Sequence, residues 1–134
     1  MNSNYVTIDL GGFTIDCANE AAAGISDHTI NFRGIIVRNG RVTRCSIGVL
    51  LDSRAVLIEG VSTLSNQDAG LFLGNSGNLV IRSISNDNGG TGIFRYGLFL
   101  SCPSNAIDNT IVGNDFGNLH TDQAGCNLSG NLAP

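Results

Sequence analysis

A glycine followed by three apolar residues recurs along this chain of 134 residues, and three of the copies lie at intervals of twenty-odd residues. These three begin at Gly48, Gly70 and Gly97, so they lie 22 and then 27 residues apart, and the last two both read GLFL. A unit that recurs at an interval of twenty-odd residues is typical of stacked repeats, in which each unit packs mainly on its two neighbours. This pattern restricts the chain to a repetitive architecture.

Two further short phrases accompany the glycine runs, one of three apolar residues and one of the form apolar-x-polar. Residues 56–58 and 79–81 follow the first two copies, and residues 64–66 and 84–86 precede the last two. Gly, Asn, Asp and Ser separate these runs, which are too short for helices, so we expect strands. Three short strands per repeat predict an all-β parallel β-helix, a solenoid of about five short coils in which each strand pairs with its counterpart one coil on.

The opening stretch 6–15 reads Val-Thr-Ile-Asp-Leu-Gly-Gly-Phe-Thr-Ile. Together with the later Gly-apolar-x-apolar and apolar-x-Asn phrases, it resembles the right-handed parallel β-helix repeats of the pectin-lyase-like superfamily. The resemblance covers about residues 4–117 and implies right-handed coils. It also implies a search for calcium-binding acids, an arginine base or paired carboxylates that act on polysaccharide. The signature phrases of pectate lyases, polygalacturonases and uronate epimerases are absent, and enzymes of this superfamily typically have more than five coils.

The length fits a single domain, residues 1–134, and the apolar fraction of 42% excludes a disordered chain. We expect the polar segment 118–134 to cap or cover part of the stack, and 87–96 to protrude as a loop. The first coil starts close to Met1, so a neighbouring chain or the segment 18–28 is expected to cover its open strand edges.

Charge and cysteine usage exclude several classes of protein. The net charge is −4 and all seven basic residues are arginine, which argues against a nucleic-acid binder. No apolar run is long enough for a membrane span and no signal peptide is visible, so no membrane partner is expected and the compartment stays open. No metal or cofactor is expected, because the cysteines and histidines form no ligand pattern.

The four cysteines are open to two interpretations. Cys102 and Cys126 lie about one coil apart, so a disulfide between them is geometrically possible. Alternatively, Cys17, Cys45 and the other two are small buried residues stacked between coils.

Alternation along the strands predicts which side chains face outward. If Val49 and Leu51 point into the coil, then Leu50 points out. A second outward row follows if the first and third residues of 56–58 and 79–81 point inward. The two outer apolar rows predicted in this way are Leu50, Phe72 and Phe99, and Ile36, Leu57 and Val80.

Two contiguous apolar rows exceed the scattered exposed residues of an ordinary monomer and predict an interface. We therefore expect a homo-oligomer, either a dimer or a trimer. The alternatives are that the C-terminal tail lies over one row, or that Phe72 and Phe99 form a sugar-binding platform. Phenylalanine offers no polar edge to a sugar, which weighs against the platform.

Asn66, Asn86 and Asn114 share one place in the repeat and predict an asparagine ladder, in which each amide donates to the carbonyl of the next. Ordinary solvent-exposed turn asparagines are the competing interpretation.

Charged residues are sparse, and the candidates for surface chemistry are Asp52, Arg54, Asp87 and Arg82. None of them lies in a recognisable catalytic phrase. Arg82 and Glu59 are also expected to be cross-strand neighbours, most simply as a structural ion pair.

Three hypotheses for function remain. The first is a non-catalytic β-helix module for glycan binding or homo-oligomeric assembly, which the missing catalytic motifs favour. The second is a polysaccharide lyase or glycoside hydrolase that acts on acidic polysaccharide. The third is a fragment of a larger tailspike-like or periplasmic β-helix protein.

Overall fold

The computed structural model describes residues 1–27, 31–90 and 92–134, and within this part of the chain it contains strands and no helix. One sheet contains β1 (Thr7–Asp9), β2 (Thr14–Asp16), β4 (Ile36–Thr43), β6 (Leu57–Leu64), β8 (Leu79–Ile81), β9 (Ile84–Asn86), β11 (Asn105–Ile107) and β13 (Asn127–Ser129). The other contains β3 (Ala23–Ser26), β5 (Ile47–Leu51), β7 (Ala69–Leu73), β10 (Tyr96–Leu100) and β12 (Gly117–Thr121).

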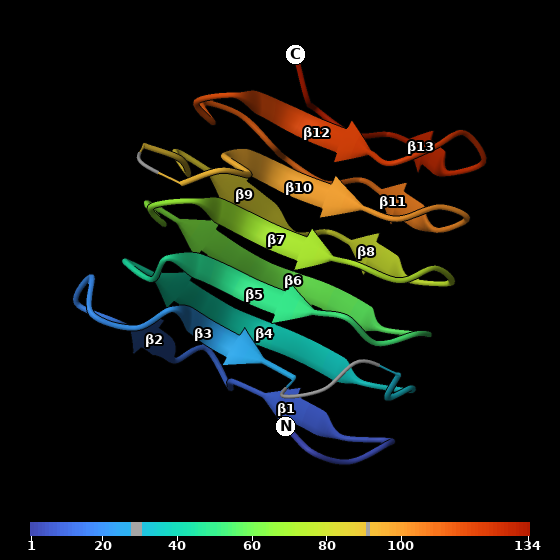
Figure 1. The fold of residues 1–134 in the computed structure, drawn as a ribbon, viewed down its shortest axis with the longest axis horizontal. Coiled ribbons are helices and arrows are strands. Elements are labelled where there is room, and N and C mark those ends of the chain that lie inside the picture. Colours follow the sequence, from blue (N-terminus) through green and yellow to red (C-terminus); the bar gives the residue numbers. More distant parts are fainter. Residues whose placement is uncertain (28–30, 91) are drawn as a thin grey trace.

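Every strand pairs in parallel with a counterpart one turn away along the chain. The eight-stranded sheet has the order β1-β4-β6-β8-β11-β13, with β2 beside β4 and β9 beside β6, and the five-stranded sheet has the order β12-β10-β7-β5-β3. In Figure 1 the strands of the five-stranded sheet lie one above another, from β3 near the N-terminus to β12 near the C-terminus. The chain is thus a parallel β-solenoid of about five turns, which confirms the fold class predicted from the repeats.

The strands β4 and β6 each turn a corner within their length. Residues 36–38 of β4 pair with β1, and residues 41–43 pair with β2. Between these halves Asn39 has a φ of 58°, and Gly60 has a φ of 59° at the same place in β6. Asn and Gly tolerate this left-handed conformation at low cost. The corner divides the sheet into two arms, so each full turn has three sides, as the three short runs per repeat predict.

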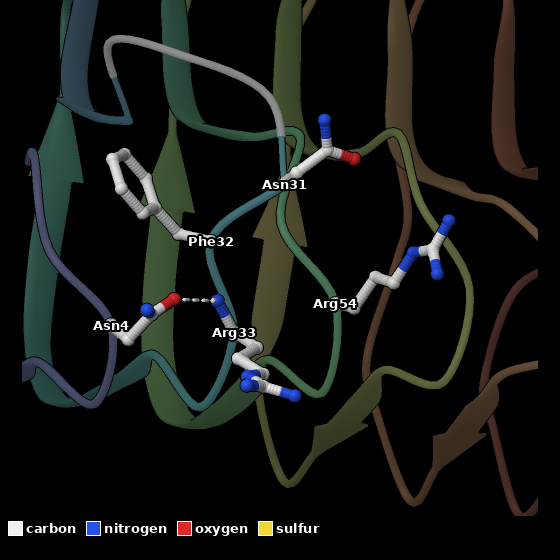
Figure 2. Close-up of a pocket in the computed structure, with 5 residues that line it drawn as sticks. All are labelled: Asn4, Asn31, Phe32, Arg33 and Arg54. Atoms are coloured by element: carbon white, nitrogen blue, oxygen red, sulfur yellow. Dashed lines mark hydrogen bonds between the residues drawn. The ribbon is translucent and has the colours of Figure 1, made fainter.

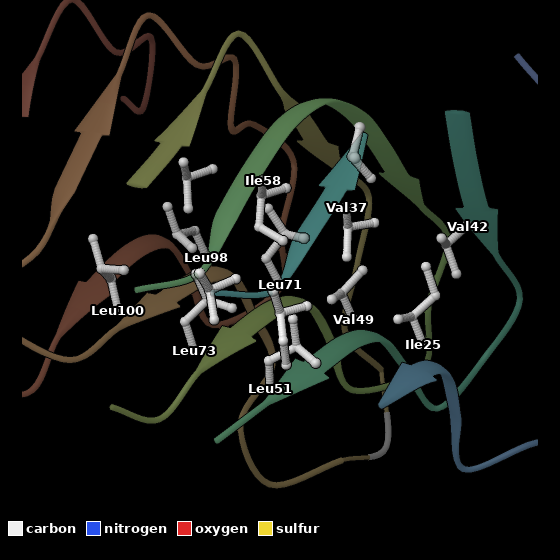
Figure 3. Close-up of a cluster of buried hydrophobic side chains, with 14 of the residues drawn as sticks. Ile25, Val37, Val42, Val49, Leu51, Ile58, Leu71, Leu73, Leu98 and Leu100 are labelled. Carbon is white, nitrogen blue, oxygen red and sulfur yellow. The ribbon is translucent and has the colours of Figure 1, made fainter. Parts of the chain in front are cut away.

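The core lies between the two sheets and is built by the glycine-apolar runs. Val49, Leu71 and Leu98 are paired in register along β5, β7 and β10, and all three are buried. Figure 3 shows them facing Val37 and Ile58 of the other sheet. A parallel row of Leu51, Leu73 and Leu100 is also buried, which confirms both inward rows predicted from the sequence.

Val80 was expected in the second outward-facing row, and this prediction is wrong. The segment 57–59 pairs with 79–81, so Ile58 lies opposite Val80 and both are fully buried. Comparison of the repeats matched 56–58 with 79–81 because both are apolar triplets. A shift of one residue exchanges the two faces of a strand. The outward row on this side is Ile36, Leu57 and Leu79.

The asparagine ladder exists, but Asn88 replaces Asn86 in it. Leu64 pairs with Asn86, so the residue two places on, Asn66, lies opposite Asn88. The Asn88 Oδ1 accepts hydrogen bonds from the backbone N–H and the amide of Asn66, at 3.1 and 2.8 Å. Its own amide donates to Asn114 Oδ1 at 3.0 Å. Asn86 instead accepts a bond from the backbone N–H of Val112.

Two disulfides join neighbouring turns, one near each end of the stack. Cys102 is bonded to Cys126, and Cys17 to Cys45, so no cysteine is free. Cys45 holds the ladder position next to Asn66, whose Oδ1 accepts the Cys45 N–H at 3.0 Å. The Cys17–Cys45 bond therefore continues the ladder covalently into the first turn.

Two segments expected to cover the ends of the stack are part of it. Residues 23–26, within the segment 18–28, form β3, in which Ala23 and Ile25 pair with Ile47 and Val49. Residue 28 lies outside the described residues. The expected capping tail, 118–134, contributes most of β12 and all of β13, so it forms a further turn. Both segments use their backbone groups to extend the sheets rather than to cover an edge.

Candidate ligand-binding surface

A row of side chains, three of them with rings, runs along the outer face of the five-stranded sheet. Leu50, Phe72, Phe99 and His120 are paired in register on β5, β7, β10 and β12. The rings of Phe72 and Phe99 are stacked, with centroids 4.5 Å apart and planes 6° apart. Each of these two rings therefore covers one face of the other. The first of the two outer rows predicted from the sequence is thus in place, and all its members are half-buried.

The segment before β10 folds back onto this face and widens it. The buried carboxylate of Asp68 accepts the backbone N–H groups of Phe94 and Arg95, at 2.7 and 3.0 Å. Gly92 packs so closely on Asp68 that a Cβ there would collide with the carboxylate. The Phe94 ring consequently lies 4.6 Å from that of Phe72. The described part of the segment 87–96 is therefore anchored to the sheet, and only residue 91 lies outside the description.

Three more side chains complete the surface at its C-terminal side. Tyr96 stacks on His120 with centroids 4.4 Å apart, and it meets Phe116 edge-on at 5.4 Å. The Arg95 guanidinium lies 5.2 Å from the centre of the Phe116 ring, a cation–π contact. The aromatic surface, as we call it, consists of Phe72, Phe94, Tyr96, Phe99, Phe116 and His120.

The aromatic surface offers both apolar and polar groups. Phe116 is its most exposed ring, with 62% of its surface accessible. The phenol of Tyr96 and the imidazole of His120 combine an apolar body with a polar tip. Arg95 adds a guanidinium whose Nε is buried without a hydrogen-bond partner among the described atoms. The polar edge that Phe72 and Phe99 lack is thus supplied by their neighbours.

Four members of the surface were not predicted as site residues. The signal for His120 was present, because 118–120 is a degenerate copy of the run that begins at Gly97. Phe94, Tyr96 and Phe116 come from outside the repeated phrases, so repeat analysis alone could not place them.

The four polar candidates from the sequence do not form one site. Arg82 pairs with Glu59, as expected, and Asp87 lies exposed at a corner beside Gly113. Asp52 and Arg54 make no salt bridge with each other in the described part of the chain.

Asp52 lies beside a second carboxylate, that of Asp27. The Asp27 carboxylate accepts the backbone N–H of Asp52 at 2.9 Å and the hydroxyl of Ser53 at 2.6 Å. Burial, and secondarily the charge of Asp27, raise the pKa of Asp52 above its ordinary value. The folded state therefore gains stability from this group as the pH falls through its raised pKa.

Among residues 1–27, 31–90 and 92–134, no three His, Cys, Asp or Glu side chains lie close enough together to hold a metal ion. No helix in these ranges could cross a membrane.

Comparison of the chain with protein-family models, with curated proteins and with solved structures found no match. The fold defines its class as a parallel β-solenoid of about five turns.

Proposed function

We propose that the chain is a non-catalytic carbohydrate-binding module of the β-solenoid class, related to the pectin-lyase-like superfamily, and that the aromatic surface holds the sugar. The observation that carries the proposal is the group of rings on one outer face, bordered by the polar groups of Tyr96, His120 and Arg95. Ligand sites typically combine aromatic walls with a few polar groups that fix orientation. The apolar C–H faces of sugar rings pack on such walls, and their hydroxyls bond to the polar groups.

Stacking of the turns does not require this many rings. The same outer row carries Ser26 and Leu50 in the first turns, and those turns pair equally well. Phe94 and Phe116 lie outside the row and are brought to it by the Asp68 anchor and by the segment before β12. Rings that the fold does not need for packing, gathered on a solvated face, favour a binding role.

Phe116→Ala should weaken oligosaccharide binding by about tenfold, because it removes the most accessible ring of the surface. The measurement is isothermal titration calorimetry against a panel of neutral and acidic oligosaccharides. The matched control is Phe13→Ala, which removes a ring that is 78% exposed but lies in the turn between β1 and β2, outside the aromatic surface. Analysis of the sugars after incubation should recover them intact, since we propose binding without turnover.

Wild-type protein that binds no member of the panel would contradict the proposal. An equal loss of affinity in Phe116→Ala and Phe13→Ala would also contradict it. Cleaved products would favour a lyase or hydrolase, with Asp27 and Asp52 as the first carboxylates to replace.

Self-association is a second candidate function, favoured by the other outer row. Ile36, Leu57 and Leu79 lie in register on the eight-stranded sheet, and all are half-buried in the single chain. A row of this kind suits a symmetric contact between two or three copies. We expect sedimentation of wild-type protein to show a dimer or trimer that Leu57→Asp shifts toward monomer. A wild type that sediments as a monomer at all accessible concentrations would refute this candidate.

A further inference from the structure

A cavity of about 260 Å³ opens beside the first turns of the solenoid, away from the aromatic surface. Figure 2 shows the side chains that line it, which are Asn4, Asn31, Phe32, Arg33 and Arg54. The lining contains two guanidinium groups and two amides, and it contains no acidic side chain. Guanidinium groups only donate hydrogen bonds, and amides can donate as well.

The two arginines occupy equivalent places in neighbouring turns. Arg33 and Arg54 form an isolated parallel bridge, so their backbones pair directly. Like charges opposite each other on neighbouring strands are destabilising unless something compensates them. Neither arginine makes a salt bridge within the described part of the chain.

Three other arginines of the solenoid pair with acids across turns. Arg38 bonds to Asp9 at 2.8 Å, and Arg44 bonds to Asp16. Arg82 bonds to Glu59 in the same way. At the cavity the compensating carboxylate is replaced by open space between two positive side chains, in a protein whose net charge is −4.

We propose that this cavity binds an oxyanion, a carboxylate, sulfate or phosphate group, held between the guanidinium groups of Arg33 and Arg54. The planar fork of arginine matches such groups with two parallel hydrogen bonds. In Figure 2 the two guanidinium groups point in different directions. Both side chains are exposed and can turn toward a shared ligand. The side-chain Oδ1 of Asn4 accepts a hydrogen bond from the Arg33 backbone N–H at 3.1 Å, which fixes the wall of the cavity.

The test is a titration of the full chain with inorganic phosphate, sulfate and acetate, followed by NMR of backbone and arginine N–H groups, with sodium chloride keeping the ionic strength constant. At least one of the three anions should give saturable shifts at Arg33 and Arg54, and the order of affinities names the group preferred. Arg33→Gln and Arg54→Gln should each weaken that binding by about tenfold, since each removes a charge-assisted pair. Arg41→Gln is the matched control, because Arg41 is an exposed arginine on β4 that also lacks a salt bridge in the described ranges.

Absence of saturable shifts with all three anions would overturn the proposal, as would an equal loss of binding in Arg41→Gln. Thermal unfolding without added anion separates binding from structure. Each cavity variant should unfold at the same temperature as wild type or above it, because a like-charge contact is relieved. Loss of both binding and thermal stability would show that the arginines are structural, and would overturn the proposal too. The outcome is independent of whether the aromatic surface binds sugar.

Discussion

Leu71→Ala should lower the free energy of unfolding by about 2–5 kcal/mol, the range for truncation of a large aliphatic side chain in a packed core. Leu71 is 1% exposed and lies between Val49 and Leu98 of the neighbouring turns. Its loss leaves a cavity that the two neighbours can fill only by shifting strands that are paired on both edges. Urea unfolding followed by far-ultraviolet circular dichroism measures the change.

Leu57→Ala is the matched control for this experiment. Leu57 is also a leucine in a central strand, but its side chain faces outward and is half-buried. We expect it to cost clearly less than Leu71→Ala. A loss below about 0.5 kcal/mol for Leu71→Ala, the size of an ordinary surface effect, would show that the faces of β7 are assigned the wrong way round.

Asn88→Ala should cost at least about 2 kcal/mol, because each buried polar group left without a partner costs about 1–3 kcal/mol. The Asn88 amide donates to the Thr63 carbonyl at 3.2 Å, to the Ser85 hydroxyl at 3.1 Å and to Asn114. Its carbonyl accepts both bonds from Asn66, which is itself 1% exposed. Alanine removes all of these bonds at once and admits no side-chain replacement.

Asn86→Ala provides the comparison, since Asn86 is the residue that the repeat phrases place in the ladder. It is partly buried, and its side chain accepts one hydrogen bond, from the Val112 N–H at 3.1 Å. The same unfolding experiment should find the smaller loss in Asn86→Ala. A larger loss of unfolding free energy in Asn86→Ala than in Asn88→Ala would support the ladder predicted from the sequence and contradict the observed register.

The three central strands of the five-stranded sheet, β5, β7 and β10, could be predicted almost residue by residue. A glycine followed by an apolar run gives a period of two with an unambiguous start, so Leu71 and Leu73 fall inside and Phe72 falls outside. The copies align without insertion along β5, β7 and β10. The structure adds a degenerate copy in β3, where Gly24 lies opposite Gly48 of β5.

The other sheet was less predictable because its register depends on corners rather than on composition. Residues 56–58 and 79–81 are both apolar triplets, yet Val56 lies opposite Asn78, whose side chain accepts the Val56 N–H at 2.9 Å. The left-handed residues at the corners and the hydrogen bonds across turns set this alignment. Neither is visible as an apolar pattern, so Val80 was assigned to the wrong face and Asn86 to the wrong place.

Only part of the aromatic surface could be predicted from the sequence. Phe72 and Phe99 follow from strand alternation alone. Phe94 reaches the same face only because Asp68 binds the backbone of 94–95, a contact between distant segments that no local pattern encodes. Together with Tyr96 and His120, Phe94 extends the apolar row into a surface that also carries polar groups. This favours the proposed sugar binding over self-association as the role of this face.

Selective labelling of tyrosine shows whether carbohydrate binds at the aromatic surface. The chain has two tyrosines and no tryptophan, so a ¹³C-tyrosine sample gives ring signals from Tyr96 in the aromatic surface and from Tyr5 near the other end of the stack. On titration with the best-binding oligosaccharide, the ring signals of Tyr96 should shift saturably, and those of the exposed Tyr5 should stay in place. A sugar that binds without moving the Tyr96 signals, or that moves both tyrosines alike, would contradict the assignment of the aromatic surface as a carbohydrate site.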